Sequence, residues 1–144
     1  MAKITSWRFK ATAKMIDTPK VDSWRFNADG KAVESIGDGD FSYVPQEGGA
    51  DHSAWGVGVS DDGAVYVADT WNHRVIKYVN GKRRAVFGQF GNPESAAVDL
   101  EMLFGPRDIA VGLEGNLFVT DTGNDRVIVL TPDLTPIRAL GGSG

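Results

Sequence analysis

Two stretches of the chain repeat each other at a spacing of 52 residues, and this repeat limits the folds that the chain can adopt. Residues 65–78 read VYVADTWNHRVIKY, and residues 117–130 read LFVTDTGNDRVIVL. Each copy has an apolar segment, a polar turn with the pattern Asp-Thr-x-Asn-x-Arg and a second apolar segment, which is the pattern of a β-hairpin. A hairpin that returns at a fixed spacing predicts a repeat architecture.

A third copy of the repeat, with less of the pattern, stands at the same spacing upstream. When residues 13–26 are aligned with the later copies, Asp17 corresponds to Asp69 and Asp121. Asp22 stands at the position where the later copies have arginine. We therefore predict three four-stranded antiparallel meanders, with the strands of the first at 4–9, 14–16, 23–26 and 32–36. The three repeats span about 3–37, 55–88 and 107–141, with long connectors at 38–52 and 90–104 and a flexible tail at 142–144.

The second and third repeats resemble the NHL repeat, over residues 60–78 and 105–130, whereas the first repeat matches it weakly. The resemblance implies an all-β fold in which each repeat is one blade of a β-propeller, usually a six-bladed ring. It also implies a protein that binds partners, because most members of this family do so and fewer are enzymes.

A row of three blades predicts that the chain associates. A blade is apolar on both faces and hides them only against neighbouring blades, so an open row exposes one apolar face at each end. Large exposed apolar faces are rare on soluble monomers. A homodimer of two half-rings would close a six-bladed ring. The alternatives are a piece of a longer chain and an open sandwich of three blades.

Composition excludes several classes of function. The net charge is −4, and the longest basic run is the triplet Lys82 to Arg84, so the basic surface of a nucleic-acid-binding protein is not expected. No apolar run approaches the ~18 residues that span a bilayer, and no signal peptide is expected at the start. The chain has no cysteine, and nothing in the sequence indicates its cellular location.

The charged residues of the repeat favour a structural role. We predict that each aspartate accepts hydrogen bonds from backbone N–H groups of its own turn, while each arginine joins neighbouring strands or blades. Catalysis needs one site, whereas every blade needs its turn, so recurrence supports this interpretation. The residues concerned are Asp17, Asp69, Arg74, Asp121 and Arg126.

No metal site or cofactor is predicted. The only histidines are His52 and His73, which are too few for a three-histidine site within one chain. Asp38, Asp40 and Asp51 offer oxygen ligands, but they lack the spacing of an EF-hand loop. Whether connector 38–52 binds a cation stays open.

The connectors indicate where a ligand would bind. In a meander, successive turns alternate between the two ends of the strands, so the Asp-Thr-x-Asn-x-Arg turns and the long connectors share one face. Aromatic residues on loops of a rigid scaffold are typical of binding sites. The alternative is that Phe41, Tyr43 and residues 100–104 fold back to cover the blades. The predicted binding residues are Phe41, Tyr43, His52, Trp71, Asn72, His73, Asn92 and Asp125.

We therefore predict a non-enzymatic protein-binding or glycan-binding module that uses this face. The resemblance leaves two alternatives open: a propeller enzyme of the metal-dependent lyase or lactone hydrolase type, and an excised or designed half-ring that only assembles with itself. In such enzymes carboxylates and histidines line the central channel. Here the first strands carry Val57, Val59, Ile109 and Val111, which favours binding over catalysis.

Overall fold

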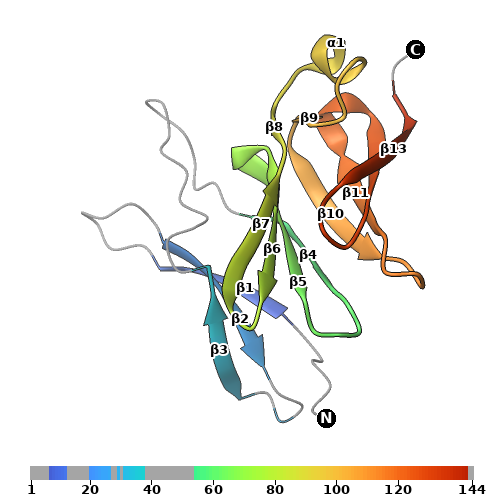
Figure 1. Ribbon diagram of the computed structural model, residues 1–144. Coiled ribbons are helices and arrows are strands. Elements are labelled where there is room, and N and C mark those ends of the chain that lie inside the picture. The colour runs from blue at the N-terminus through green and yellow to red at the C-terminus, as the bar shows by residue number, and fades with distance from the viewer. Residues whose placement is uncertain (1–6, 13–19, 27–28, 30, 38–53, 143–144) are drawn as a thin grey trace. The chain divides into compact units, whose positions relative to one another are not determined.

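The computed structural model describes residues 7–12, 20–26, 29, 31–37 and 54–142 (Figure 1). The chain divides into two compact units, Met1–Ser53 and Ala54–Gly144. The regular secondary structure of the described part is mainly β-strand, as the repeat predicts. None of its helices is long and apolar enough to cross a membrane.

The first unit contains a three-stranded antiparallel sheet in the order β1-β2-β3. Its strands are β1 (Trp7–Thr12), β2 (Lys20–Phe26) and β3 (Ala32–Ile36). The first strand was predicted at 4–9 and a further strand at 14–16 was predicted beside it. The predicted order is wrong, because β1 pairs directly with β2, with Trp7 opposite Arg25 and Thr12 opposite Lys20. Residues 13–19, which include Asp17, lie outside the described residues.

Each of the two segments suits a strand by its own sequence. Both WRFKAT and KVDSWRF alternate largely between apolar and polar residues, as strands with one buried face do. The register of the pair does not match this alternation throughout, because Ala11 lies opposite Val21 but Trp7 lies opposite Arg25. The apolar pattern therefore accounts for the two strands and not for the register between them.

The second and third repeats each form a four-stranded antiparallel meander, as predicted. We call the sheet of the second repeat blade 2 and that of the third blade 3. The Asn80-Gly81 turn joins the last two strands of blade 2 with φ of 50° and 70°, as expected for a tight hairpin. Blade 2 comprises β4 (Gly56–Val59), β5 (Val65–Asp69), β6 (Arg74–Val79) and β7 (Lys82–Phe87), and blade 3 comprises β10 (Pro106–Val111), β11 (Leu117–Asp121), β12 (Arg126–Leu130) and β13 (Pro136–Gly141).

The two blades pack face to face, with β10 against β4 and β5. Glycine allows this close approach, since a Cβ at Gly56 would lie 2.5 Å from the carbonyl oxygen of Arg107. Hydrogen bonds from blade 2 to blade 3 cross the junction. Thr70 Oγ1 donates to the carbonyl of Pro106 at 2.7 Å, the Tyr66 hydroxyl donates to that of Pro132 at 3.0 Å, and Lys77 Nζ donates to Asp133 Oδ1 at 2.9 Å. The shared core contains Ala64, Tyr66, Ala68, Val75 and Phe87 of blade 2 and Ile109, Leu117, Val119, Ile128 and Leu130 of blade 3.

The connector between the blades has a structure of its own, at one end of the two sheets (Figure 1). It contains β8 (Gln89–Phe90), the helix α1 (Pro93–Ala96) and β9 (Met102–Leu103), and β8 and β9 pair in parallel. Asn92 caps the helix, since its Oδ1 accepts a hydrogen bond from the Ser95 N–H at 3.1 Å. Leu103 is fully buried, so this connector folds back onto the sheets.

Asp69 and Asp121 do not cap the backbone of their own turns, so the prediction is wrong for these two residues. Their carboxylates accept no capping hydrogen bond from the backbone N–H groups of the short 3-10 turns η1 (Thr70–Asn72) and η2 (Thr122–Asn124). Each aspartate lies directly opposite the arginine of the next strand and pairs with it instead: Asp69 with Arg74 at 2.7 Å, and Asp121 with Arg126 at 2.9 Å. The antiparallel register therefore explains the five-residue spacing of the pair.

In blade 3 the pair also holds the connector. Asp121 accepts a hydrogen bond from the Phe104 N–H at 2.7 Å, and Asn124 Nδ2 donates to Asp121 at 2.8 Å. The guanidinium of Arg126 donates to the carbonyls of Ala96 and, at 2.6 Å, Met102. Arg126 thus joins neighbouring strands, which is one of the two predicted roles, through its bond to Asp121, and it also ties the connector to the turn.

We predict that Arg126→Ala lowers the free energy of unfolding by about 3–5 kcal/mol, because it leaves the buried Asp121 carboxylate without its cationic partner. Arg126→Lys keeps the charge but cannot make the hydrogen bonds to Asp121, Ala96 and Met102 together. It should therefore lower the free energy of unfolding by less than Arg126→Ala does. The exposed Lys82→Ala serves as the control and should change stability by less than about 0.5 kcal/mol. Chemical denaturation of the three variants tests this, and an Arg126→Ala chain as stable as the parent would contradict it.

Candidate functional site

A groove of about 250 Å³ opens between blade 2 and blade 3, on the face that carries the connector. We call it the junction groove. Apart from Thr70 and Thr122, its lining offers few polar groups, and aromatic rings dominate it. The lining residues are Trp55, Thr70, Trp71, His73, Phe104, Gly105, Arg107, Thr122 and Gly123.

Two tryptophans and an arginine are among the largest side chains that line this groove. The rings of Trp55 and Trp71 meet edge to face, with centroids 6.5 Å apart and planes at 74°. The Arg107 guanidinium lies over the Trp55 ring, with its carbon 4.6 Å from the centroid, which is a cation–π contact. Trp55 is 50% exposed, so a ligand could still cover much of its surface.

His73 joins the groove to the connector. It ends η1 in a left-handed conformation with φ of 54°, and its Nδ1 accepts a hydrogen bond from the Gly105 N–H at 3.0 Å. Its ring packs on Phe90 and Phe104, with centroids at 4.8 and 5.8 Å. Burial lowers the pKa of His73, against the opposing effect of the Asp121 and Asp69 carboxylates. The imidazole therefore acts as a neutral acceptor that positions the backbone entering blade 3.

The positions of Trp71 and Gly123 are equivalent in the two repeats, yet their environments differ. The Gly123 N–H donates to the Phe104 carbonyl at 2.8 Å, and a Cβ at Gly123 would lie 2.4 Å from the Phe104 ring. Blade 3 therefore needs glycine where its connector lies on the turn. In blade 2 the same position carries an indole that lines the junction groove.

Of the predicted binding residues, the structure brings Trp71 and His73 together in the groove. Asn72 is engaged within blade 2, where its Nδ2 donates to both oxygens of Asp69. Asn92 caps α1, and Asp125 is the exposed left-handed residue that ends η2. Phe41, Tyr43 and His52 lie outside the described residues.

The other seven groove residues were not among the predicted ones, and those with large side chains are Trp55, Phe104 and Arg107. A signal for two of them was present, because Trp55 and Arg107 occupy equivalent positions just before or at the start of the first strand of each blade. The structure stacks these two equivalent positions on each other across the junction. A comparison of the residues at equivalent positions of the two repeats would have paired an aromatic ring with a cation here, and so would have indicated this contact.

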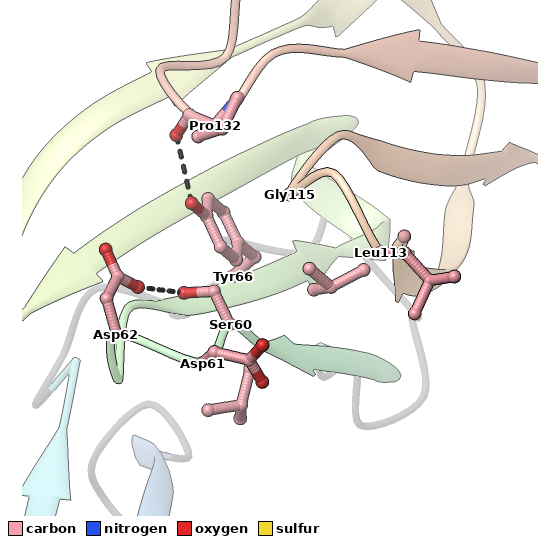
Figure 2. A pocket seen from close by; sticks show the side chains of 10 residues that line it. Ser60, Asp61, Asp62, Tyr66, Leu113, Gly115 and Pro132 are labelled. Atoms are coloured by element: carbon pink, nitrogen blue, oxygen red, sulfur yellow. Dashed lines mark hydrogen bonds between the residues drawn. The ribbon is translucent and has the colours of Figure 1, made fainter.

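A second hollow, of about 360 Å³, lies at the opposite end of the same junction (Figure 2). Asp61, Asp62 and the exposed Leu113 stand at its rim, and the Tyr66 hydroxyl bonded to Pro132 forms one wall. Asp62 is engaged by its own turn, because it accepts hydrogen bonds from the Ser60 hydroxyl and the Ala64 N–H. These bonds lower the pKa of Asp62, and they assign it to turn formation.

No group of three histidine, aspartate or glutamate side chains that could hold a metal ion occurs among the described residues. In the same part of the chain, the carboxylates of Asp69 and Asp121 are bound by arginine and asparagine. The chemistry available at the groove is therefore that of aromatic packing and of one exposed guanidinium.

Comparison with known protein families confirms that the sequence resembles the NHL repeat. The NHL repeat family matches residues 52–78, which include β4, η1 and the hairpin of β5 with β6. The match falls on the second repeat of this chain. A comparison with curated protein sequences finds no match.

The solved structures similar to this chain are propeller proteins. A streptogramin B lyase aligns with a TM-score of 0.54 and 13% identity, over 88% of this chain and 38% of its own. Virginiamycin B lyase from Staphylococcus aureus aligns with a TM-score of 0.52 and 18% identity, over 93% of this chain and 45% of its own. Its catalytically inactive variant with quinupristin aligns with a TM-score of 0.52 and 14% identity, over 90% and 39%.

These alignments establish the propeller-type fold. At such identities they show the fold alone, and the chain spans less than half of the length of the lyases that it matches. The site residues therefore have to be judged from their own chemistry.

We predict that the stability of the chain falls as the pH is lowered through the titration range of His73. The folded pKa is lowered from about 6.5, so the unfolded chain binds the proton first. The stability due to neutral His73 is complete above pH 6.5 and is lost as the pH falls toward the folded pKa. Melting temperatures between about pH 7.5 and pH 5 measure the effect.

His73→Asn tests the assignment, because asparagine tolerates the positive φ and does not titrate in this range. This variant should flatten the pH dependence, and His52→Asn gives the contribution of the other imidazole. A His73→Asn chain with the pH profile of the parent would show that His73 does not cause it.

Proposed function

We propose that the chain is a non-enzymatic binding module and that the junction groove, on the face bearing the connector, receives a protein or glycan ligand. The observation that carries this proposal is the pair of tryptophans that line an open groove on a rigid junction. Burial of a large apolar side chain contributes about 1.5–3 kcal/mol, so a ligand that covers these rings gains substantially. Tryptophan, tyrosine and arginine are the residues most enriched at the energetic centres of protein interfaces.

The groove is held in place by buried hydrogen bonds. Thr70 donates to Pro106 across the junction, and His73 accepts from Gly105. A preorganised site loses less conformational entropy on binding than a mobile one. These bonds support a groove that is already formed before a ligand binds, since they join blade 2 to the segment that enters blade 3.

A lyase-type enzyme is the second candidate, because the similar solved structures include streptogramin B and virginiamycin B lyases. The test is incubation of the chain with quinupristin and Mg²⁺, followed by mass spectrometry of the antibiotic. Conversion of the antibiotic with turnover, seen as a new chromatographic peak or fragment spectrum, would overturn the binding-module proposal. An unchanged antibiotic would remove this activity from consideration.

We further propose that a second copy of the chain completes the ring. The support comes from blade 3, whose face turned away from blade 2 exposes Phe118 and Leu140 at 36% and 41%. The equivalent Tyr66 and Phe87 of blade 2 are only 1% and 6% exposed, because blade 3 packs on that face. Two copies of a chain that spans 38–45% of the propeller lyases would supply a similar length, and the same packing would then bury blade 3.

We predict that Trp71→Gly, which copies blade 3, changes the melting temperature by no more than about 5 °C but weakens ligand binding about tenfold or more. The parent and the variant are screened against a glycan array and a displayed library of random peptides, and affinities are measured for the best ligands. Val98→Ser, at an exposed connector residue outside the groove, is the control. If the best ligands bind the variant and the parent equally, the groove is not the binding site.

We predict a homodimer in native mass spectrometry at micromolar concentration. Phe118→Asp should convert it to a monomer, because a charge would then be buried in the blade-to-blade contact, whereas the exposed Val98→Asp should not. A parent chain that is monomeric under these conditions would rule out the two-copy ring. A trimer or tetramer would do the same.

A further inference from the structure

We infer that the junction groove recognises an extended peptide, with an apolar side chain seated against Trp55 and Trp71 and an adjacent carboxylate paired with Arg107. This inference rests on the proposed function and narrows its ligand class. The two tryptophans would supply the apolar contact, and the guanidinium at the rim would fix the position of the acid.

The size of the groove indicates that it holds one side chain. Its volume is about 250 Å³, whereas sites for whole small molecules usually measure ~300–1,000 Å³. The nearly perpendicular rings of Trp55 and Trp71 form a notch with two apolar walls. A leucyl, prolyl or aromatic side chain fits such a notch, as in the aromatic-lined grooves that bind proline-rich segments.

The guanidinium of Arg107 selects the charge of the ligand. It is exposed and lies over Trp55, and among the described residues no hydrogen bond or ion pair joins it to an acceptor. A planar guanidinium matches a carboxylate with two parallel hydrogen bonds. The same positive charge disfavours an ammonium ligand, although aromatic cages otherwise suit such cations.

The remaining polar groups favour a peptide over a sugar. Recognition of a neutral sugar requires several donors and acceptors at the groove, but the Thr70 hydroxyl is bonded to Pro106 and His73 Nδ1 to Gly105. From Phe104 and His73, which line the groove, the aromatic rings continue as a strip to Phe90 outside it. The ring centroids of Phe90 and Phe104 are 5.4 Å apart, and these side chains are 59% and 39% exposed. An extended chain anchored at Arg107 could follow this strip, whereas a compact sugar would leave it uncovered.

The inference is tested with a displayed library of random peptides, selected on the purified full chain. We expect the selected peptides to share an apolar residue next to aspartate, glutamate or a free C-terminal carboxylate. Synthetic peptides with glutamate changed to glutamine, or with an amidated C-terminus, distinguish the two sources of the carboxylate. The change that removes the contacting acid should weaken binding about tenfold or more, since hydrogen bonds to charged groups are strong.

Variants of the chain complete a thermodynamic cycle. Arg107→Gln should weaken the binding of the acidic peptide by a similar factor. It should leave the affinity for the peptide with glutamine in place of glutamate unchanged. Arg84→Gln, which removes an exposed arginine from β7, should have no effect and serves as the matched control. Melting curves of both variants show that the fold is intact, because neither side chain is buried.

The outcomes separate this inference from the proposed function. Peptides that lack an acid, or that bind Arg107→Gln as well as the parent, overturn the inference. If such peptides, or glycans, lose affinity for Trp71→Gly, the groove is still a binding site and only the ligand class is wrong. If no selected peptide depends on Trp71 or Arg107, and no glycan depends on Trp71, both proposals fail.

Discussion

The buried carboxylate of Asp121 is the group on which the third repeat depends. Taking a carboxylate out of water costs several kcal/mol unless a cation and hydrogen-bond donors surround it. Arg126, Asn124 and the Phe104 N–H supply these contacts, from the next strand, the turn and the connector respectively. Satisfying one charge therefore brings three segments together, and the connector is fixed at the end of the blade where the groove opens.

Periodicity and turns were sufficient to predict blades 2 and 3 from the sequence, since their strands alternate and their hairpin turns carry residues that tolerate positive φ. The first repeat was less predictable, because β1 pairs directly with β2 in a register that follows neither the spacing of the repeat nor the apolar pattern of the two strands. The partners of Asp69 and Asp121 also escaped prediction. A sequence shows that Asp and Arg recur, but only the strand register shows that they lie opposite each other.

The candidate site illustrates the same limit. Trp71 and His73 could be named because they lie in the repeated turn itself, and both line the groove. The contact of Trp55 with Arg107 joins two blades, so no local pattern contains it. The effect of Gly123 was likewise hidden, because glycine is required there by the Phe104 ring of a connector that is absent from the repeat motif.

The connector has a consequence for local motion. The Phe104 N–H is bonded to Asp121, and the Gly123 N–H is bonded to the Phe104 carbonyl, so neither amide can exchange its hydrogen until the connector leaves the turn. The parallel pairing of β8 with β9 closes the same segment on itself. Residues 89–104 and η2 thus form one cooperative opening unit, of the kind that native-state hydrogen exchange detects as a single step. One wall of the groove, at Phe104 and Gly123, belongs to this unit, so local opening and loss of the groove are the same event.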